Sequence, residues 1–551
     1  MPTVYRHFAY RAVREIEKRF PGKSTYVVEA GVTPSGKIHL GNFNDVVIAD
    51  AVLRALEDEG YDSKGYLVID SMDPLRQAPS FAPDEFKRSV YEYVGRPFER
   101  IPDPWGCHGN YAEHFVKPIE ESFEEYGISL NIIWAREIHL RDVFIKHLLR
   151  VIEEREEVRR ILNEIRAKAG HTRLYPEEWI PYRPLCSRCG RIDEAVKPIE
   201  VVGEGVIKYM CGACGDEGVA NVRRGEGKPP WRIDWPLRWV TLDVHFEPLG
   251  KDHMASGSGY DTGCALLREF FHREPPVPVF YDFVYWVERK GDEKVYMKFS
   301  KRRGVGLGAE EWIKYAPPEV LRFQILKRDV RDLYREALSH WYFDFRLIPS
   351  YVEEFDAFEE RYFESKGGQL LKDTYMLSLV REHPPRKPRR VSYNHLVRIA
   401  AWMEDLDDGM RMLARQRKLE GMAEWEVEDA RKRLLMASNW LKEVGLTAAL
   451  QSPDQALKAL RELDRKVLRA FIEVTREILS GAEPREVGNV VRTVAGKLGL
   501  RTRRDRLLVY RAFYQAILGE DEGPPLRRLL ARSEVLQLLA KLLNELECNI
   551  A

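Results

Sequence analysis

The chain has 551 residues and a mass of 64.2 kDa, which predicts about three or four domains rather than one. Hydrophobic residues make up 44% and charged residues 32%, so the composition excludes an intrinsically disordered chain. Basic and acidic residues number 87 each, which argues against a uniformly basic nucleic-acid binder. Residues 386–551 nevertheless hold 31 Lys and Arg against 24 Asp and Glu, a net charge of +7, which leaves −7 on residues 1–385. This basic tail predicts a polyanionic partner.

Targeting signals are not evident in the sequence. No apolar stretch approaches the roughly 18 residues that a membrane-spanning helix needs. Residues 1–20 are rich in Arg, Lys and Glu and do not have the apolar centre of a signal peptide. We therefore expect a cytoplasmic protein that has neither a membrane nor DNA as a partner.

The first part of the chain alternates short apolar runs with a longer helical pattern. Residues 25–32 and 66–70 are predicted strands, and residues 39–60, which lie between them, repeat apolar side chains at helical spacing. Residues 131–134 are a third predicted strand. Strand, helix and strand in this order predict βαβ units and a parallel sheet. The expected fold class is therefore α/β, with a Rossmann-like parallel-sheet domain.

Changes in pattern divide the rest of the chain. Further strand signals occur at residues 239–246 and 280–287, and the pattern after residue 317 is almost wholly helical. A Pro-rich linker at residues 383–388 precedes alternating apolar and charged stripes that predict an all-α C-terminal region. The predicted segments are a first α/β half at 1–102, an insertion at 103–230, a second α/β half at 231–316, a helical connecting domain at 317–385 and the α-helical region at 386–551.

The turn after the first strand, residues 31–38, is close to a P-loop but departs from that pattern twice. Ile38 has no hydroxyl for magnesium, and Pro34 removes a backbone N–H from the phosphate cradle. Residues 39–42 (HLGN) follow at the start of the predicted helix, where free N–H groups and the helix dipole favour a phosphate. They predict a site for the α-phosphate of a nucleotide, although His39 alone would fit an ordinary capping histidine equally well.

A second cationic loop, residues 298–304 (KFSKRRG), lies far downstream. Lysine and arginine on a flexible loop can move onto the β- and γ-phosphates of ATP and neutralise departing pyrophosphate. A run of charges is more commonly a solvated surface. The combination with residues 39–42 favours a two-part ATP site.

These two motifs carry a resemblance to a known family. Residues 34–42 (PSGKIHLGN) resemble the HIGH signature of class I aminoacyl-tRNA synthetases, and residues 298–302 resemble their KMSKS loop. Three motifs between them have the same order as in the class I lysyl-tRNA synthetases found mainly in archaea: 232–239 (RIDWPLRW), 247–253 (EPLGKDH) and 260–263 (YDTG). Phe299 and Arg302 replace the usual Met and second Ser of the loop, whereas the phosphate-facing Lys301 is retained.

The resemblance implies ATP-dependent activation of L-lysine to lysyl-adenylate and its transfer to tRNA(Lys), with Mg²⁺ accompanying ATP and the helical tail binding the anticodon. The implied catalytic residues are His39, Asn42, Lys298 and Lys301. The implied ATP-binding residues are Pro34, Ser35, Gly36, His39, Gly41, Asn42, Asp252 and Lys301. The implied lysine-binding residues are Gly31, Thr33, Trp231, His253 and Tyr281.

The physical chemistry of this lysine pocket is reasonable. Aromatic walls can hold an aliphatic stem, and a ring face attracts an ammonium group. Core packing accounts for Trp231 or Tyr281 equally well. The sequence singles out no carboxylate that would pair with the ε-ammonium.

Two groups of residues are candidate metal ligands. Cys186-x2-Cys189 and Cys211-x2-Cys214 are separated by 21 residues, which is close to the zinc-ribbon pattern, and four Cys ligands predict a closed, structural zinc site. A looser cluster also consists of zinc-ligating residue types: Asp103, Cys107, His108 and His114. The residues alone favour partly exposed histidines beside a core cysteine, whereas the resemblance favours a second zinc ion.

Three alternatives remain open from the sequence. Another class I synthetase, for Arg, Glu or Cys, would share the ATP motifs and differ in the amino-acid pocket. A nucleotidylyltransferase could use the same phosphate chemistry but has no need of a basic helical tail. A zinc-ribbon RNA-binding module would explain the cysteines and the tail but leaves the two ATP motifs without a purpose.

Overall fold

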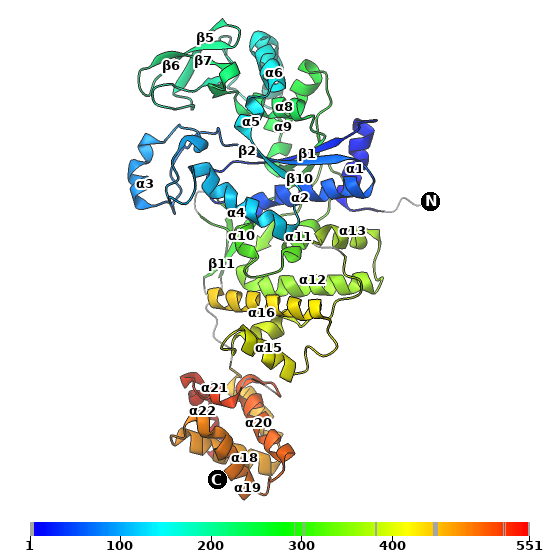
Figure 1. The fold of residues 1–551 in the computed structure, drawn as a ribbon, viewed down its shortest axis with the longest axis vertical. Coiled ribbons are helices and arrows are strands. Elements are labelled where there is room, and N and C mark those ends of the chain that lie inside the picture. The colour runs from blue at the N-terminus through cyan, green and yellow to red at the C-terminus, as the bar shows by residue number, and fades with distance from the viewer. Residues whose placement is uncertain are drawn as a thin grey trace. The chain divides into compact units, whose positions relative to one another are not determined.

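The computed structural model describes residues 5–290, 293–300, 304–380, 383–444, 450–521, 523 and 525–548 (Figure 1). The predicted catalytic Lys301 and the neighbouring Arg302 lie outside the described residues.

A six-stranded sheet in which all neighbours are parallel forms the centre of the first part of the chain. Its strands, in spatial order, are β13 (Ala337–Leu338), β10 (Val277–Tyr281), β9 (Phe246–Gly250), β1 (Tyr26–Val32), β2 (Ser63–Ile69) and β3 (Asn131–Trp134). The chain proceeds from β1 outward to β2 and β3, and later returns on the other side of β1 with β9 and β10. The order reverses between β1 and β9, and ligands of open α/β sheets bind at such a point, beyond the carboxyl ends of the strands. The predicted α/β class with a parallel sheet is confirmed.

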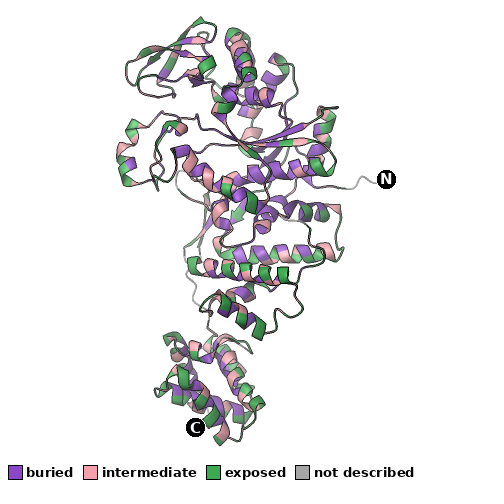
Figure 2. Ribbon diagram, in the orientation of Figure 1, coloured by how far each residue is buried: buried purple, intermediate pink, exposed green. Residues whose placement is uncertain are grey.

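Helices cover both faces of this sheet, so its strands are largely buried (Figure 2). Helix α2 (Leu40–Asp58) lies along one face, and α8 (Trp231–Leu242) lies on the opposite side (Figure 1). Side chains of a strand alternate between the faces. Val27 packs into the same apolar cluster as Ile233 and Trp235 of α8, so alternate β1 residues starting from Val27 face α8.

Residues 103–230, the predicted insertion, contain both an edge strand of the central sheet and a separate module. Strand β3 pairs with β2, so the part outside the central sheet follows β3. It contains α5 (Ala135–His139), α6 (Asp142–Glu153) and α7 (Arg155–Lys168). An antiparallel sheet of β5 (Val196–Gly203), β6 (Val206–Cys211) and β7 (Glu217–Asn221) follows.

One expected strand is wrong. Residues 239–246 carry a strand signal in the sequence. In the structure they begin within the last turn of helix α8 and pass through a turn at Asp243, where φ is 53°. They reach β9 only at its first residue, Phe246. A short apolar run such as Trp239–Leu242 fits a buried helix as well as a strand, and burial of α8 among aromatic side chains decides for the helix. The second signal, 280–287, spans the end of β10 and the start of β11 (Val284–Lys290).

The chain after β10 adds a small sheet and a group of helices. Strands β11, β12 (Glu293–Lys298) and β14 (Trp341–Phe343) form the sheet. In the described residues after 317, the short strands β13 and β14 interrupt an otherwise mainly helical pattern, as predicted. The helices are α10 (Ala309–Trp312), α11 (Pro318–Leu326), α12 (Ile348–Phe363) and α13 (Gln369–Ser378). Helix α4 (Tyr111–Tyr126) contacts α10 and α11.

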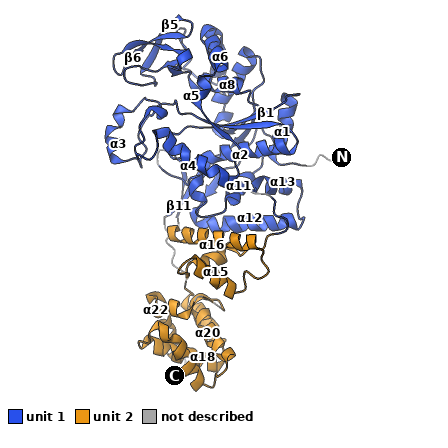
Figure 3. Ribbon diagram, in the orientation of Figure 1, with its two compact units in different colours: residues 1–387 blue, residues 388–551 orange. Residues whose placement is uncertain are grey.

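The chain divides into two compact units, residues 1–387 and 388–551 (Figure 3). The described residues of the second unit form helices: α14 (Tyr393–Ala400), α15 (Leu406–Arg415), α16 (Glu424–Val444), α17 (Pro453–Arg461), α18 (Arg465–Leu479), α19 (Val487–Lys497), α20 (Arg503–Leu518), α21 (Leu526–Leu529) and α22 (Ser533–Cys548). Helices α17 to α22 enclose an apolar core of their own. Among the helices that the structure describes, none is both long and apolar enough to cross a membrane.

Candidate active site and metal centres

The predicted nucleotide turn lies at the carboxyl end of β1, next to the point where the strand order reverses. His39 is the N-cap of α2, and its carbonyl accepts hydrogen bonds from the N–H groups of Asn42 (2.8 Å) and Phe43 (3.1 Å). A side chain at Gly41 would lie 3.1 Å from the ring of His39, so the glycine lets this ring lie over the start of the helix. The buried Oδ1 of Asn42 has no hydrogen-bond partner among the described residues. A buried amide oxygen without a partner suits a ligand that donates a hydrogen bond.

The described start of the second predicted motif, residues 298–300, and residues 305–311 that follow it pack onto this turn. The rings of Phe299 and His39 meet edge to face, with their centroids 5.3 Å apart. The backbone N–H of Leu40 donates to the carbonyl of Leu307 at 2.8 Å. Lys37 forms an ion pair with Glu311, whose carboxylate also accepts the N–H of Gly308. The structure therefore brings together the two motifs that are more than 250 residues apart in sequence.

The basic side chain of this loop that the structure describes is Lys298. Its ammonium lies over the ring of Phe283, 3.1 Å from the centroid. Partial burial lowers the pKa of Lys298, although the nearby carboxylates of Asp252 and Asp282 oppose this shift. Asp252, the predicted ribose contact, is exposed in the turn after β9. Lys298 and Asp252 thus share one side of the site.

The remaining predicted ATP-binding residues shape the turn itself. Residues 34–36 lie between β1 and α2, where the N–H of Ser35 donates to the carbonyl of Thr33 at 2.9 Å. The hydroxyl of Tyr111 donates to the carbonyl of Ser35 at 3.2 Å and ties the turn to α4.

The predicted lysine-binding residues surround the carboxyl ends of β1, β9 and β10. Trp231 stacks on Trp235 with ring centroids 4.8 Å apart, and the ring of His253 meets that of Trp235 edge to face, with centroids 4.9 Å apart. The Tyr281 hydroxyl donates to Asp45 Oδ2 at 2.6 Å, and burial raises the pKa of Tyr281 well above its usual value. A methyl group at Gly31 would meet no atom of the described residues within 4 Å. The structure therefore leaves open space beside Gly31.

A cavity of about 410 Å³ extends from this region. Of the predicted residues, Thr33, Ser35 and Trp231 line it. Its other polar lining comes from Asp73, Arg76, Gln77, Arg183 and Lys228. Polar and aromatic lining of this kind suits a charged small-molecule substrate.

Sequence reasoning missed a buried network of charges beneath the cavity. The guanidinium of Arg238 donates to Asp70 and, at 2.9 Å, to Asp234, which also pairs with His139 at 2.7 Å. Lys228 lies 2.7 Å from Asp73. Burial alone would raise the pKa of Asp234, but the neighbouring cations and His139 lower it well below its usual value. The available signal was a charged residue inside an otherwise apolar segment, as at Asp234 and Arg238 of α8.

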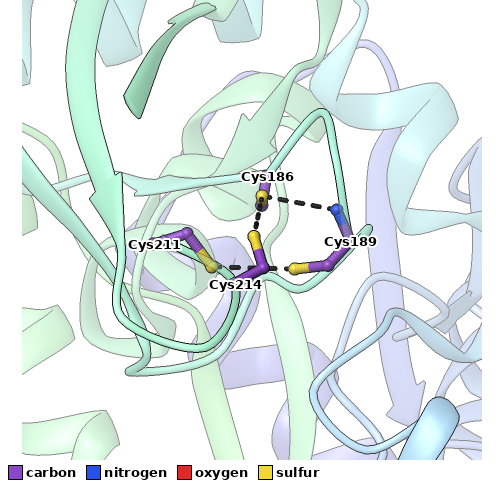
Figure 4. Close-up of side chains that lie close together, drawn as sticks. All are labelled: Cys186, Cys189, Cys211 and Cys214. Atoms are coloured by element: carbon purple, nitrogen blue, oxygen red, sulfur yellow. Dashed lines mark hydrogen bonds between the residues drawn. The ribbon is translucent and has the colours of Figure 1, made fainter. Parts of the chain in front are cut away.

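The four cysteines of the predicted ribbon converge on one point (Figure 4). The Sγ atoms of Cys186 and Cys214 are 3.6 Å apart, as are those of Cys189 and Cys211. All four sulfurs lie within 4.8 Å of one another. Four convergent thiols without a disulfide fit a tetrahedral zinc ion, which would hold the two turns of the ribbon together.

The looser cluster is also assembled. The Sγ of Cys107 is 3.1 Å from Nδ1 of His108 and 3.2 Å from Nδ1 of His114, and a carboxylate oxygen of Asp103 is 3.3 Å from the same His114 atom. The ligand atoms of the four residues all lie within 4.8 Å. The set of one thiol, two imidazoles and one carboxylate fits zinc chemically.

Comparison with known proteins identifies the family. Residues 6–381 match the family described as tRNA synthetases class I (K). The chain belongs to this family. It is 32% identical over 538 residues to a lysine–tRNA ligase of Methanocaldococcus jannaschii, covering 94% of this chain and 96% of that protein. It is 34% identical over 526 residues to a lysine–tRNA ligase of Archaeoglobus fulgidus, covering 94% and 95%. A lysine–tRNA ligase of Pyrococcus horikoshii is 32% identical over 541 residues, covering 95% and 97%.

The relatives are similar to nearly the whole chain, including its helical tail, whereas the family match ends at residue 381. The recognised resemblance to class I synthetases is thereby confirmed. A free-standing zinc-ribbon RNA-binding module and a nucleotidylyltransferase are no longer needed to explain the motifs.

Proposed function

We propose that this chain is a class I lysyl-tRNA synthetase, which uses ATP to activate L-lysine as lysyl-adenylate and transfers the lysyl group to tRNA(Lys). The contact between Phe299 and His39 carries this proposal, because these residues belong to the two candidate ATP motifs and lie near the switch point of the parallel sheet, where ligands of such folds bind. The family and its lysine–tRNA ligase relatives support it.

The first step needs positioning and charge stabilisation rather than a protein nucleophile. The carboxylate of lysine attacks the α-phosphorus of ATP, and His39 and Asn42 donate hydrogen bonds to the charge that develops on the phosphate oxygens. The positive charges of Lys298 and Lys301 neutralise negative charge on the leaving pyrophosphate. Mg²⁺ bound to ATP neutralises part of its charge. In the second step a hydroxyl of the terminal adenosine of tRNA attacks the adenylate and releases AMP.

The other parts of the chain have supporting roles in this proposal. The Cys186–Cys189–Cys211–Cys214 set holds a structural zinc ion, and the Asp103 cluster holds a second one. Residues 317–385 connect the catalytic part to residues 386–551, which bind the anticodon region of tRNA. Translation takes place in the cytoplasm, and we expect the protein to act there.

The test is aminoacylation of tRNA(Lys) with labelled lysine and Mg-ATP, with wild type and His39→Ala in parallel. Removal of a group that stabilises the transition state lowers kcat by about tenfold or more. Equal rates for the two proteins, with the fold verified by circular dichroism, would contradict the site assignment.

A further inference from the structure

Two buried glutamates face each other in the central sheet. Strands β1 and β9 are parallel neighbours in which Val28 pairs with Phe246, so Glu29 and Glu247 are opposite one another. Their exposed fractions are 1% and 5%. Directly paired residues of adjacent strands project from the same face of a sheet, with side chains close enough to interact.

Both carboxylates project toward helix α8. Val27 and Leu249, which share a face with Glu29 and Glu247 by strand alternation, pack into the cluster that contains the apolar residues of α8. Trp235 Nε1 donates to both carboxylate oxygens of Glu247 at 3.0 Å, and Trp239 Nε1 donates to one of them. The carboxylate of Glu247 is therefore fixed by α8.

Glu29 is not fixed in this way. Its Oε2 atom is buried and has no hydrogen-bond partner among the described residues. A buried carboxylate without a partner is costly, and burial, together with the charge of Glu247, raises the pKa of Glu29 well above its usual value. A cation bound beside Glu29 would offset the cost of burying its carboxylate.

Open space lies beside Gly31, on the same face of β1 as this carboxylate. Gly31 is two residues beyond Glu29 on the same face of β1, and a methyl group there would meet no atom of the described residues within 4 Å. Two residues of a strand span about 6 to 7 Å, a length that an extended four-carbon stem can bridge. A lysine whose carboxylate lies at the 34–42 turn can run past Gly31 and place its ammonium at Glu29.

The charge balance of the buried network also favours an added cation. Four buried carboxylates lie around one guanidinium: Glu29, Asp70, Asp234 and Glu247 with Arg238. Arg238 already donates to Asp70 and Asp234, and Lys228 pairs with Asp73 and, at 3.3 Å, with Asp234. The ion pairs described for these two cations are thus with aspartates, whereas Arg238 acts on the two glutamates through its charge.

On the basis of the proposed function, we propose that Glu29 binds the ε-ammonium of L-lysine and makes the pocket selective for a cationic amino acid, and that Glu247 opposite it is a second acidic side chain beside this position. Glu29 is the specificity residue that contacts substrate. Glu247 is a positioning residue, because the two tryptophans of α8 hold it.

The experiment compares wild type, Glu29→Gln and a buried control, Glu359→Gln, in aminoacylation of tRNA(Lys). Glu359 is 3% exposed and accepts a hydrogen bond from Tyr375 at 2.9 Å, in the α12–α13 pair. Each protein is assayed with lysine and with norleucine, which has the same aliphatic stem without the ammonium. We expect Glu29→Gln to lower kcat/KM for lysine by about 30-fold or more, because one member of a buried charge pair is removed. The preference for lysine over norleucine should fall by a similar factor, while Glu359→Gln retains it.

The outcomes separate this inference from the proposed function. Failure of wild type to charge lysine would contradict the proposed function itself. Charging by wild type together with an unchanged lysine preference in folded Glu29→Gln would overturn the inference alone. If Glu29→Gln does not fold, Glu29→Asp is tested in its place. This variant keeps the carboxylate but has a side chain that is shorter by one methylene group. It should lose more activity with lysine than with homolysine, and equal losses for both substrates would overturn the inference.

Discussion

The ring of Phe299 packs edge-on against the ring of His39, at an interplanar angle of 81°. Phe299 is 5% exposed and also contacts Trp286 and Phe343, so it anchors the start of the 298–304 loop in an aromatic cluster. The substitution of Phe for the usual Met of this motif therefore supplies a rigid contact to the histidine of the other motif. This contact joins the two motifs that we propose to form the nucleotide site.

Phe299→Ala should lower kcat for lysyl-tRNA formation by about tenfold, because His39 loses the side chain that positions it. Phe299→Met, which restores the usual residue of the family and fills similar space, is the matched control and should retain most of the activity. Steady-state aminoacylation at saturating lysine and ATP measures both. Full activity in Phe299→Ala would show that the contact does not orient His39.

Cys186→Ser should remove the ribbon zinc and lower the thermal stability, because a structural zinc ion contributes directly to folding. Cys264→Ser is the control, since Cys264 is buried at α9 (Gly259–Ala265), away from the cysteine cluster. Zinc content is measured by atomic emission and melting by calorimetry. The same zinc content in Cys186→Ser as in wild type would contradict the ribbon.

His114→Ala should lower the zinc content by one further ion per chain when it is combined with Cys186→Ser. His114 supplies one of the four convergent ligand atoms, and its loss leaves Asp103, Cys107 and His108 with an incomplete site. If the single and double variants hold equal amounts of zinc, the Asp103 cluster binds no ion and its histidines are ordinary surface residues.

Removal of residues 388–551 should weaken charging of tRNA(Lys) mainly through KM for tRNA. The two units have separate cores, so residues 1–387 should remain folded while the basic helical region is lost. Counterion release makes contacts to the phosphate backbone dependent on salt, and the full chain should show a steeper salt dependence of KM than the truncated one. Unchanged KM for tRNA after truncation would exclude this unit from tRNA binding.

The buried Glu247 should make stability depend on pH. Burial raises the pKa of Glu247 to about 8, against 4.5 for an ordinary glutamate, although the indole hydrogen bonds oppose this shift. Between these values the folded state binds a proton that the unfolded state does not, so the free energy of unfolding falls as the pH rises, by at most about 1.4 kcal/mol per pH unit. Thermal unfolding is measured from pH 5 to 8.5 without lysine. The stability of Glu247→Gln should decrease less with rising pH than the stability of wild type. Parallel pH profiles would contradict a raised pKa.

Motifs with a fixed spacing were predictable from the sequence, and contacts across the sheet were not. The two Cys-x2-Cys pairs, the turn at residues 34–42 and the loop at residues 298–304 are each short motifs of a few residues, so local chemistry indicates them. In the sequence, Glu29 is only one charged residue in an apolar strand. Its proposed role depends on Glu247, which lies on a neighbouring strand and more than 200 residues later in the sequence. Residues 239–246 were misassigned because short apolar runs have no period that separates a strand from a buried helix.

The most direct test of the account is aminoacylation of total archaeal tRNA with each of the twenty labelled amino acids in turn, in the presence of Mg-ATP. Assays that omit tRNA are less suitable, because they would miss an activation step that requires it. The account predicts charging with lysine alone. Charging with another amino acid would leave the ATP site intact and contradict the lysine pocket, and no charging with any of the twenty would contradict the proposed function.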